Sequence, residues 1–231
     1  MANAATLCEE NLGPTPILDY QQKGIQDVAN WLDRLKQARL AYLQAAHKVL
    51  AEKVAPIYSL DELQPASMTL AKGNGSCSQR FACLEAIARA KSIATRVRGL
   101  WIDGRFWAPR FRLARQFLPR RILLAWPQFH LDDNWLGVES LFDNVEVLAA
   151  KNPKPFANDS ESLFDAVKNT AVDFDGKTGG CAGSRCDLSR FVVEDAGTFT
   201  TRDKLFATYP LLQRTLRGVL FGVLFGDRKS I

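Results

Sequence analysis

The stretch of the chain best suited to chemistry is GNGSCSQRF, which begins at Gly73 and sets a cysteine behind two glycines and a serine. Gly73 and Gly75 permit a turn that other residues resist. Ser76, followed three residues later by Gln79, has the capping-box pattern that marks the first turn of a helix. The sequence therefore predicts that Cys77 stands in the first turn of a helix.

A thiol at a helix N-terminus is suited to nucleophilic chemistry. Unpaired backbone N–H groups and the positive end of the helix dipole favour a thiolate there. The same N–H groups can hold the oxyanion that forms when sulfur attacks a carbonyl, and the resulting thioester is resolved by water or an amine. We interpret Cys77 as a candidate nucleophile. The alternative role, a small buried hydrophobic residue, fits Cys83 better because it lies between Ala82 and Leu84.

Hydrophobic spacing predicts the elements that position this cysteine. Apolar residues recur at helical spacing in 20–55, which predicts one long helix or two shorter ones, and again in 162–172. Residues 61–70 are interpreted as a polar connection, and 187–195 as a short helix. The C-terminal run 211–226 is apolar and could form a core helix or dock on a partner.

Two strands are predicted after the cysteine helix. Residues 95–102 have alternating character, and residues 121–135 read as a strand that turns and returns over 135–141. Asp132, Asp133 and Asn134 supply the turn between them.

The phrases GNGSCSQRFACLEAIARAKSIATRVRG and AWPQFHLDDNWLGVES resemble the core of the transglutaminase-like superfamily, in its small bacterial branch. Members carry a Gly-x-Cys element that opens a helix, then an R-A-x-G-I-P-x-R phrase, a His-Ala-Trp strand, an Asp/Asn-rich turn and a Trp-containing strand that ends in Asp. The resemblance covers residues 67–141. It implies an α+β, papain-like fold whose cysteine-bearing helix packs against an antiparallel sheet, with extra N- and C-terminal helices.

The resemblance also divides the chain into three parts. Residues 1–66 are expected to form an N-terminal helical segment that packs on the core, and residues 67–148 the transglutaminase-like core itself. Residues 149–231 would be a helical and loop extension to which no role is assigned.

The chain departs from this family at the general base. The family histidine should precede Ala125 and Trp126, where this chain has Leu124, which cannot take a proton. The family aspartate that orients the histidine maps to Glu139. The resemblance therefore leaves a nucleophile and a carboxylate without the base between them.

Several groups could replace the missing base. His130 follows Leu124 by six residues on the same strand, about 20 Å further along at ~3.3 Å per residue, so only a distorted strand would bring it to Cys77. Glu139 could act as the base, or the helix dipole with Arg80 or Arg96 could generate the thiolate. A thioester donor needs less help than an amide because its thiolate leaves without a proton.

The candidate catalytic residues are thus Cys77, Glu139 and His130, and the candidate substrate-binding residues are Trp126, Arg98 and Arg96. No metal and no other cofactor is predicted. Cys181 and Cys186 form a CxxxxC pair in a glycine-rich loop, which is a weak zinc signal without a second pair or nearby histidines. Loop cysteines that are either redox-linked or incidental are the favoured interpretation.

The chain has a net charge of +5, and no acidic residue occurs from 104 to 131. This segment contains Arg105, Arg110, Arg112, Arg115, Arg120 and Arg121. Such a block either is a solvated loop or attracts an anionic partner, for instance a carrier protein. Nucleic acid is disfavoured because no recognised binding module accompanies the arginines.

The longest apolar stretch is too short for a transmembrane segment, and the start of the chain lacks a signal-peptide pattern. An odd number of cysteines without a disulfide framework favours the cytoplasm.

Two functions are weighed. The first is cysteine-dependent acyl transfer, forming or cleaving an amide or thioester of a small-molecule or carrier-protein-tethered acyl substrate in a bacterial biosynthetic pathway. The second is a non-catalytic binding or scaffold protein that docks an anionic partner through the 105–121 segment. The capped Cys77 favours the first, and Leu124 opposes it.

Overall fold

The predicted cysteine helix is present in the computed structural model as α5 (Cys77–Ala90). Ser76 is its N-cap, and the capping box is confirmed. The Gln79 backbone N–H donates to Ser76 Oγ at 3.3 Å, and the Ser76 N–H donates to Gln79 Oε1 at 2.8 Å. Gly73 has a φ of 66°, in the left-handed region that glycine tolerates best. It is the C-cap of the helix that precedes α5 in the chain.

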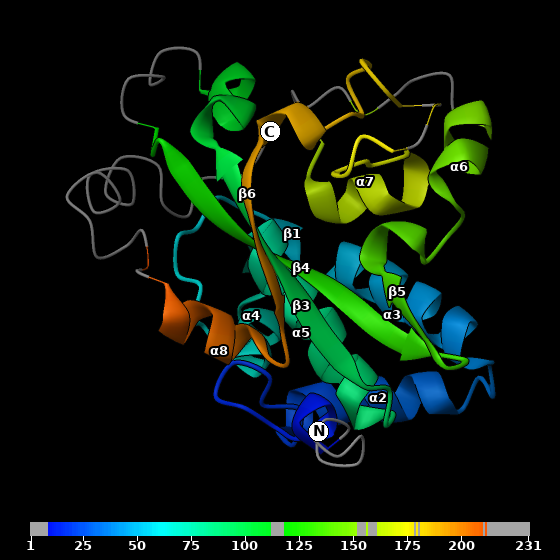
Figure 1. The fold of residues 1–231 in the computed structure, drawn as a ribbon. Coiled ribbons are helices and arrows are strands. Elements are labelled where there is room, and N and C mark those ends of the chain that lie inside the picture. Colours follow the sequence, from blue (N-terminus) through cyan, green and yellow to red (C-terminus); the bar gives the residue numbers. More distant parts are fainter. Residues whose placement is uncertain are drawn as a thin grey trace, which may run out of the picture.

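The structure describes residues 9–111, 118–151, 156, 161–177, 179, 181–209 and 211. Over these residues the fold is mixed α+β (Figure 1). The elements in chain order are α2 (Lys23–Asp33), α3 (Arg39–Lys53), β1 (Ala55–Pro56), α4 (Ala66–Lys72), β2 (Asn74–Gly75), α5, β3 (Thr95–Asp103), the 3₁₀ helix η1 (Gly104–Arg110), β4 (Arg121–Leu131), β5 (Asn134–Gly137), η3 (Val138–Ser140), α6 (Val145–Lys151), α7 (Leu163–Asn169), η4 (Ser189–Phe191), β6 (Val192–Phe199) and α8 (Arg202–Thr208).

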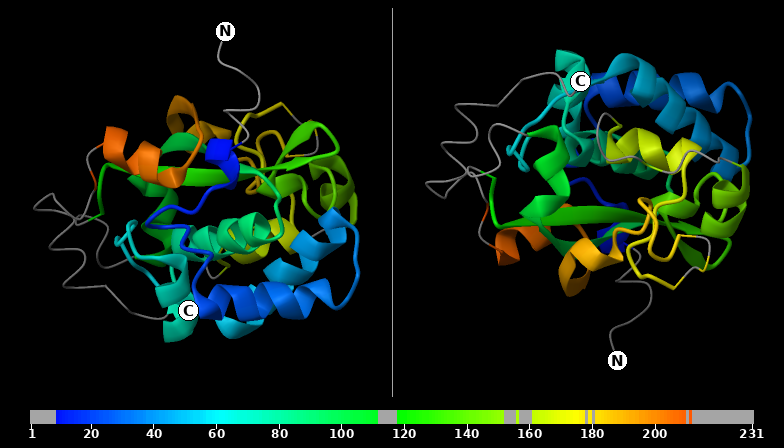
Figure 2. Two further views of the ribbon diagram at one scale, coloured as in Figure 1. Left: turned by 90° about the horizontal axis from the view of Figure 1, so that it is seen from below. Right: turned by 90° about the horizontal axis from the view of Figure 1, so that it is seen from above.

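The main sheet has the strand order β5-β4-β3-β6, and every neighbouring pair is antiparallel. Strands β3 and β4 are in continuous register, with Leu100 opposite Leu124 and Arg98 opposite Trp126. Helices α2, α3 and α5 lie on one side of this sheet (Figure 2). The predicted antiparallel sheet with the cysteine helix against it is therefore present, since α5 contacts β3 and β4.

Helix α5 is the buried centre of the fold. Every residue from Ser78 to Arg89 is buried, and α5 contacts α2, α3, α4 and α7 in addition to the sheet. A helix enclosed on all sides is ordinarily apolar all round. This one nevertheless carries three buried charged side chains, Arg80, Glu85 and Arg89.

Two of these charges have ionic partners from distant parts of the chain. Arg80 makes a two-pronged contact with Asp165 at 2.9 and 3.0 Å. Glu85 Oε1 accepts two hydrogen bonds from Arg202, at 2.5 and 3.0 Å, and the side chains of this pair are 0% and 1% exposed. A buried charge is tolerated only when it is paired and hydrogen-bonded, so these contacts fix where α7 and α8 meet α5.

The third charge is held mainly by uncharged oxygens. The Arg89 guanidinium donates to Thr95 Oγ1 at 2.7 Å and to the carbonyl of Gly13 at 2.5 Å. It also donates to the carbonyl of Thr200 at 3.1 Å. Arg89 thereby joins the segment before α2, the start of β3 and the segment before α8.

Several predictions for the other elements need correction. The 61–70 connection contains the start of α4, and Pro65 stands immediately before this helix as its N-cap. Of the helix predicted at 187–195, only the one-turn η4 is present. The chain then continues as β6, whose backbone pairs with the edge of β3. The returning strand predicted over 135–141 ends at Gly137.

Other predictions are confirmed. The 20–55 pattern forms two helices, α2 and α3, and the helix within 162–172 is α7, with Ser162 as its N-cap. Apart from Leu211, the apolar 211–226 run lies outside the described residues. In the part of the chain that the structure describes, no helix is both long and apolar enough to cross a membrane.

Removing one partner of the Glu85–Arg202 pair should destabilise the protein strongly, because it leaves an unpaired buried charge. We expect Arg202→Leu to lower the free energy of unfolding by roughly 3–5 kcal/mol, measured by urea denaturation. The exposed Lys23–Asp27 pair on α2 provides the matched control, and Lys23→Leu should leave the urea midpoint nearly unchanged. Equal effects of the two substitutions would contradict this account of α5.

Buried His47 on α3 should make stability fall with acidity. Burial lowers the pKa of His47 to about 4, and its Nε2 lies 2.5 Å from the carbonyl oxygen of Phe164. Because the folded pKa lies below the ~6.5 of an unfolded histidine, the unfolded chain binds the proton first. Stability is therefore complete above about pH 6.5 and declines by up to about 1.4 kcal/mol per pH unit toward pH 4.

Urea denaturation between pH 7 and 4 measures this decline, and His47→Gln is the comparison because its amide does not titrate. The variant should show a shallower pH dependence than the wild type, whatever its stability at pH 7. Parallel pH profiles would contradict the assignment of this decline to His47.

Candidate functional site

A cavity of about 90 Å³ lies at the N-terminal end of α5. Cys77 lines it together with side chains from the segment after β1, from η1 and from the first half of β4. The lining is mostly apolar and includes Leu60, Phe111, Leu118, Ile122, Leu124 and Leu163. Cys77 is a free, partly buried cysteine, and it lines a mostly apolar cavity instead of being enclosed in the core.

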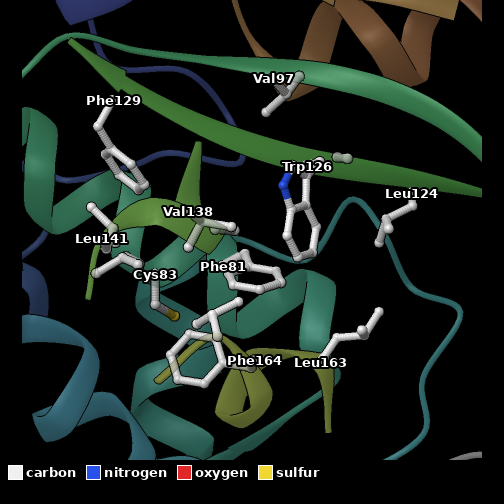
Figure 3. Packing of buried hydrophobic residues seen from close by; sticks show 14 of the residues in the cluster. Phe81, Cys83, Val97, Leu124, Trp126, Phe129, Val138, Leu141, Leu163 and Phe164 are labelled. Atoms are coloured by element: carbon white, nitrogen blue, oxygen red, sulfur yellow. The ribbon is translucent and has the colours of Figure 1, made fainter. Parts of the chain in front are cut away.

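Leu124 lies in the wall of the same cavity as Cys77. It extends from β4 toward α5 beside Trp126, with Leu163 facing it from α7 (Figure 3). Position 124, where the resemblance expects the catalytic histidine, therefore lies in the same cavity as Cys77. The leucine at this position is buried, with 6% of its surface exposed. The side chain at this position cannot exchange a proton with the thiol.

Glu139 and Trp126 are brought together, but away from the thiol. Trp126 Nε1 donates to Glu139 Oε2 at 2.5 Å, and burial raises the pKa of Glu139. Trp126 packs edge-on against Phe81 of α5, with ring centroids 5.4 Å apart. Neither residue is among the described residues that line the cavity. The structure thus gives them a mutual contact in the sheet–helix interface, and their catalytic and substrate-binding roles stay predictions.

His130 lies at the other end of α5 from Cys77. Its backbone N–H donates to the carbonyl of Ala94, just beyond the C-terminus of α5, and its ring lies 5.1 Å from that of Trp135. Because α5 has 14 residues, its two ends are about 20 Å apart. The structure does not bring His130 to the thiol, and the distorted strand that would do so is not seen.

The two candidate substrate-binding arginines contact other parts of the protein. Arg98 pairs with Asp175 at 2.7 Å and with Asp195 at 2.9 Å, and these carboxylates raise its pKa. The Arg96 guanidinium lies 4.3 Å from the centre of the Trp135 ring and donates to Gln128 at 2.6 Å. Neither is among the described residues around the cavity.

Tyr58, Glu62 and Arg110 line the cavity with Cys77. The sequence does not identify the first two as site residues, and it places Arg110 only in the arginine block. Tyr58 and Glu62 follow β1, which pairs in parallel with β2, so that Pro56 stands opposite Gly75. This short pairing lays the segment after β1 beside the turn before Cys77. A two-residue strand leaves no periodic signal in the sequence, and only the tertiary pairing shows that Glu62 and Cys77 are neighbours.

The cavity modifies the ionisation of these groups. Burial raises the pKa of Tyr58, against the opposing effect of the Arg110 cation. Burial also raises the pKa of Glu62. The Ser78 hydroxyl, which donates to its carboxylate, and the more distant charge of Arg202 act in the opposite direction.

Cys83 is enclosed in the core. Burial raises its pKa to about 12, and its Sγ donates to the carbonyl of Ala66 at 3.3 Å. The interpretation of Cys83 as a buried core residue is confirmed.

The predicted pair of loop cysteines forms a disulfide, Cys181–Cys186. Both residues are buried, at 0% and 3% exposure. The sulfurs are bonded to each other and are not available as zinc ligands. Phe174 precedes this loop in the chain, and its ring lies 4.7 Å from that of Trp126.

Several arginines of the 105–121 segment have partners within the protein. Arg105 pairs with Asp103 at 2.7 Å, Arg121 pairs with Glu194 at 2.5 Å, and Arg110 donates to the carbonyl of Glu161. Arg112 and Arg115 lie outside the described residues.

No family model, no curated protein and no solved structure matches this chain.

A histidine placed at position 124 should activate the neighbouring thiol. We expect Leu124→His to raise the rate of Cys77 alkylation by iodoacetamide at pH 7 at least about tenfold, because an imidazole in the same cavity can accept the thiol proton. Mass spectrometry of the Cys77 peptide measures the rate. Leu124→Asn, which is polar but not basic, is the control, and equal rates in the two variants would contradict the shared-cavity geometry.

Proposed function

We propose that the chain is a cysteine-dependent acyltransferase with a transglutaminase-like, papain-like core, in which Cys77 carries the acyl group as a thioester. The observation that supports this most strongly is the position of Cys77. It is a free thiol in the first turn of a capped helix, and it lines a mostly apolar cavity. The mixed α+β fold with a cysteine helix against an antiparallel sheet agrees with the proposal.

The start of α5 supplies the groups that acyl transfer requires. In the first turn of a helix the backbone N–H groups have no partner within the helix. The capping box engages the N–H of Gln79, while those of Cys77 and Ser78 precede it in the same turn. These N–H groups would hold the oxyanion that forms when the Cys77 sulfur attacks a carbonyl. The helix dipole favours the thiolate form of the attacking group.

The cavity lining indicates the kind of acyl group. Its leucine, isoleucine and phenylalanine side chains suit a hydrocarbon chain, whose transfer from water is favourable by about 0.8 kcal/mol per buried CH₂. A thioester is the donor that best fits a site with Leu124, because its thiolate leaves without first being protonated. We therefore propose a small-molecule or carrier-tethered thioester of an apolar acid as the substrate.

The alternative function is a non-catalytic protein that keeps this fold and binds an anionic partner. Leu124 in the cavity wall favours it, because that position offers no base. The described arginines of the proposed docking segment weaken this alternative, since Arg105 and Arg121 already have acidic partners.

The Cys181–Cys186 disulfide is typical of oxidising compartments, so we do not carry the expected cytoplasmic location into the proposal.

Incubation with the N-acetylcysteamine thioester of octanoate should acylate Cys77. We expect intact-mass spectrometry to show one octanoyl adduct, and peptide mapping to place it on Cys77. Cys77→Ser should show no adduct, and Cys83→Ala should be acylated as the wild type is, because Cys83 is buried away from the cavity. An adduct that persists in Cys77→Ser, or no adduct on the wild type, would contradict acyl transfer through this residue.

A further inference from the structure

We propose that Glu62 is the general base of this site, accepting the proton of the Cys77 thiol in place of the histidine that position 124 lacks. The inference rests on the proposed acyl transfer and deepens it. It comes from three features of the cavity, namely the position of the carboxylate, the identities of the other lining groups, and the hydrogen-bond chain that holds Glu62.

The first feature is position. Glu62 and Cys77 line the same cavity of about 90 Å³. The parallel pairing of β1 with β2 lays the segment that carries Glu62 along the start of α5. The Glu62 carboxylate oxygen Oε2 accepts a hydrogen bond from the hydroxyl of Ser78, the residue that follows Cys77. This contact holds the carboxylate at the same first helical turn as the thiol.

The second feature is the set of side chains available to take a proton. Besides Cys77 itself, the titratable residues in the cavity lining are Tyr58, Glu62 and Arg110. An arginine stays protonated, and burial raises the pKa of Tyr58 above its ordinary value, so that it also keeps its proton at neutral pH. Glu62 is the carboxyl group among these lining side chains, and its deprotonated form can accept a proton.

The third feature is the chain of groups that positions Glu62. Arg202 Nη1 donates to Ser78 Oγ at 3.1 Å, and the same guanidinium is ion-paired with Glu85. The Ser78 hydroxyl in turn donates a hydrogen bond to Glu62 Oε2, so Arg202 and Ser78 together fix the position of the carboxylate. The base is thus fixed from the core of the protein, much as an aspartate fixes the histidine in a catalytic triad.

The charged groups around Glu62 affect its basicity in opposite directions. Burial and the neighbouring Asp61 raise the pKa of the carboxyl, whereas the Ser78 hydroxyl and the Arg202 cation from α8 lower it. Burial is the largest of these effects, and the pKa is raised. A carboxylate of raised pKa is a better proton acceptor for a thiol than an exposed one.

The reaction step balances without any further reactant. As the Cys77 sulfur forms a bond to the carbonyl carbon of the donor, the thiol proton passes to Glu62 and the carbonyl π electrons move to oxygen. When the oxyanion collapses, the C–S bond to the donor thiol breaks. The departing thiolate then takes the proton back from Glu62, which returns to the carboxylate.

The test compares wild type, Glu62→Gln and Glu62→Asp in two reactions of the same thiol. The first reaction is acylation of Cys77 by octanoyl-N-acetylcysteamine between pH 6 and 10, followed by intact-mass spectrometry. The second is alkylation by iodoacetamide at pH 10, which reports the accessibility of the thiolate without needing a base. Glu62→Gln keeps an oxygen that can accept the Ser78 hydrogen bond, and Glu52→Gln on the exposed face of α3 is the matched control.

We expect Glu62→Gln to acylate roughly 100-fold or more slowly than wild type at pH 7. The difference should disappear toward pH 10, where hydroxide generates the thiolate directly, and alkylation at pH 10 should be unchanged. Glu62→Asp should recover part of the rate at pH 7, and Glu52→Gln should match wild type throughout. A merely structural role would slow both reactions at every pH.

Two failures can be told apart. If wild type is acylated and Glu62→Gln is acylated equally fast at pH 7, the role of Glu62 is overturned while acyl transfer stands. If wild type is not acylated although iodoacetamide labels Cys77, acyl transfer itself is overturned, and the role of Glu62 with it.

Discussion

The rest of the structure depends on the burial of one polar helix. Helix α5 is enclosed between the sheet and the other helices, yet it carries Arg80, Glu85 and Arg89 within its buried length. An unpaired charge in such a place would cost several kcal/mol. Each charge therefore requires a partner at one defined point, and the partners come from parts of the chain far apart in sequence. Asp165 belongs to α7, Arg202 begins α8, and Gly13 precedes α2.

These contacts also define the site. Once both ends and the middle of α5 are fixed, the capped first turn has one position against β4, and Cys77 meets the cavity wall that contains Leu124. The same network extends to the surface of the cavity, because Arg202 binds both Glu85 and Ser78, and Ser78 binds Glu62. The arginine that pairs with the core helix thus also binds Ser78, which holds the Glu62 carboxylate at the cavity that Cys77 lines. Stability and the proposed chemistry share these residues.

The sequence predicts what short-range patterns determine. The capping box of Ser76 and Gln79 locates the start of α5, and alternating residues locate β3 and most of β4, because these signals lie within one element. The α+β class and the antiparallel sheet are what the family resemblance implies, and the structure shows both. Whether the fold is papain-like in the sense of the transglutaminase-like resemblance stays a proposal, since the structure shows only the coarser class.

What the sequence does not predict depends on contacts between distant segments. Strand β6 pairs with the edge of β3, although its first residues, 192–195, belong to the segment that the sequence predicts as a helix. Arg98 looked available for a substrate, but Asp175 and Asp195, some 75 to 100 residues further along, bind it. Glu62 lies in what reads as a polar connection, and only the β1–β2 pairing places it at the cysteine helix.

The central claim is that Cys77 is an accessible nucleophile while the other free thiol, Cys83, is part of the core. The most direct test is iodoacetamide labelling of the native protein at pH 8, with each cysteine quantified by peptide mass spectrometry over time. The account predicts that Cys77 is alkylated in the native state at least about 100-fold faster than Cys83, which should react only after unfolding in urea, because burial raises its pKa to about 12. Equal protection of the two cysteines in the native protein would contradict the account, since a thiol as closed off as Cys83 could neither reach nor carry an acyl group.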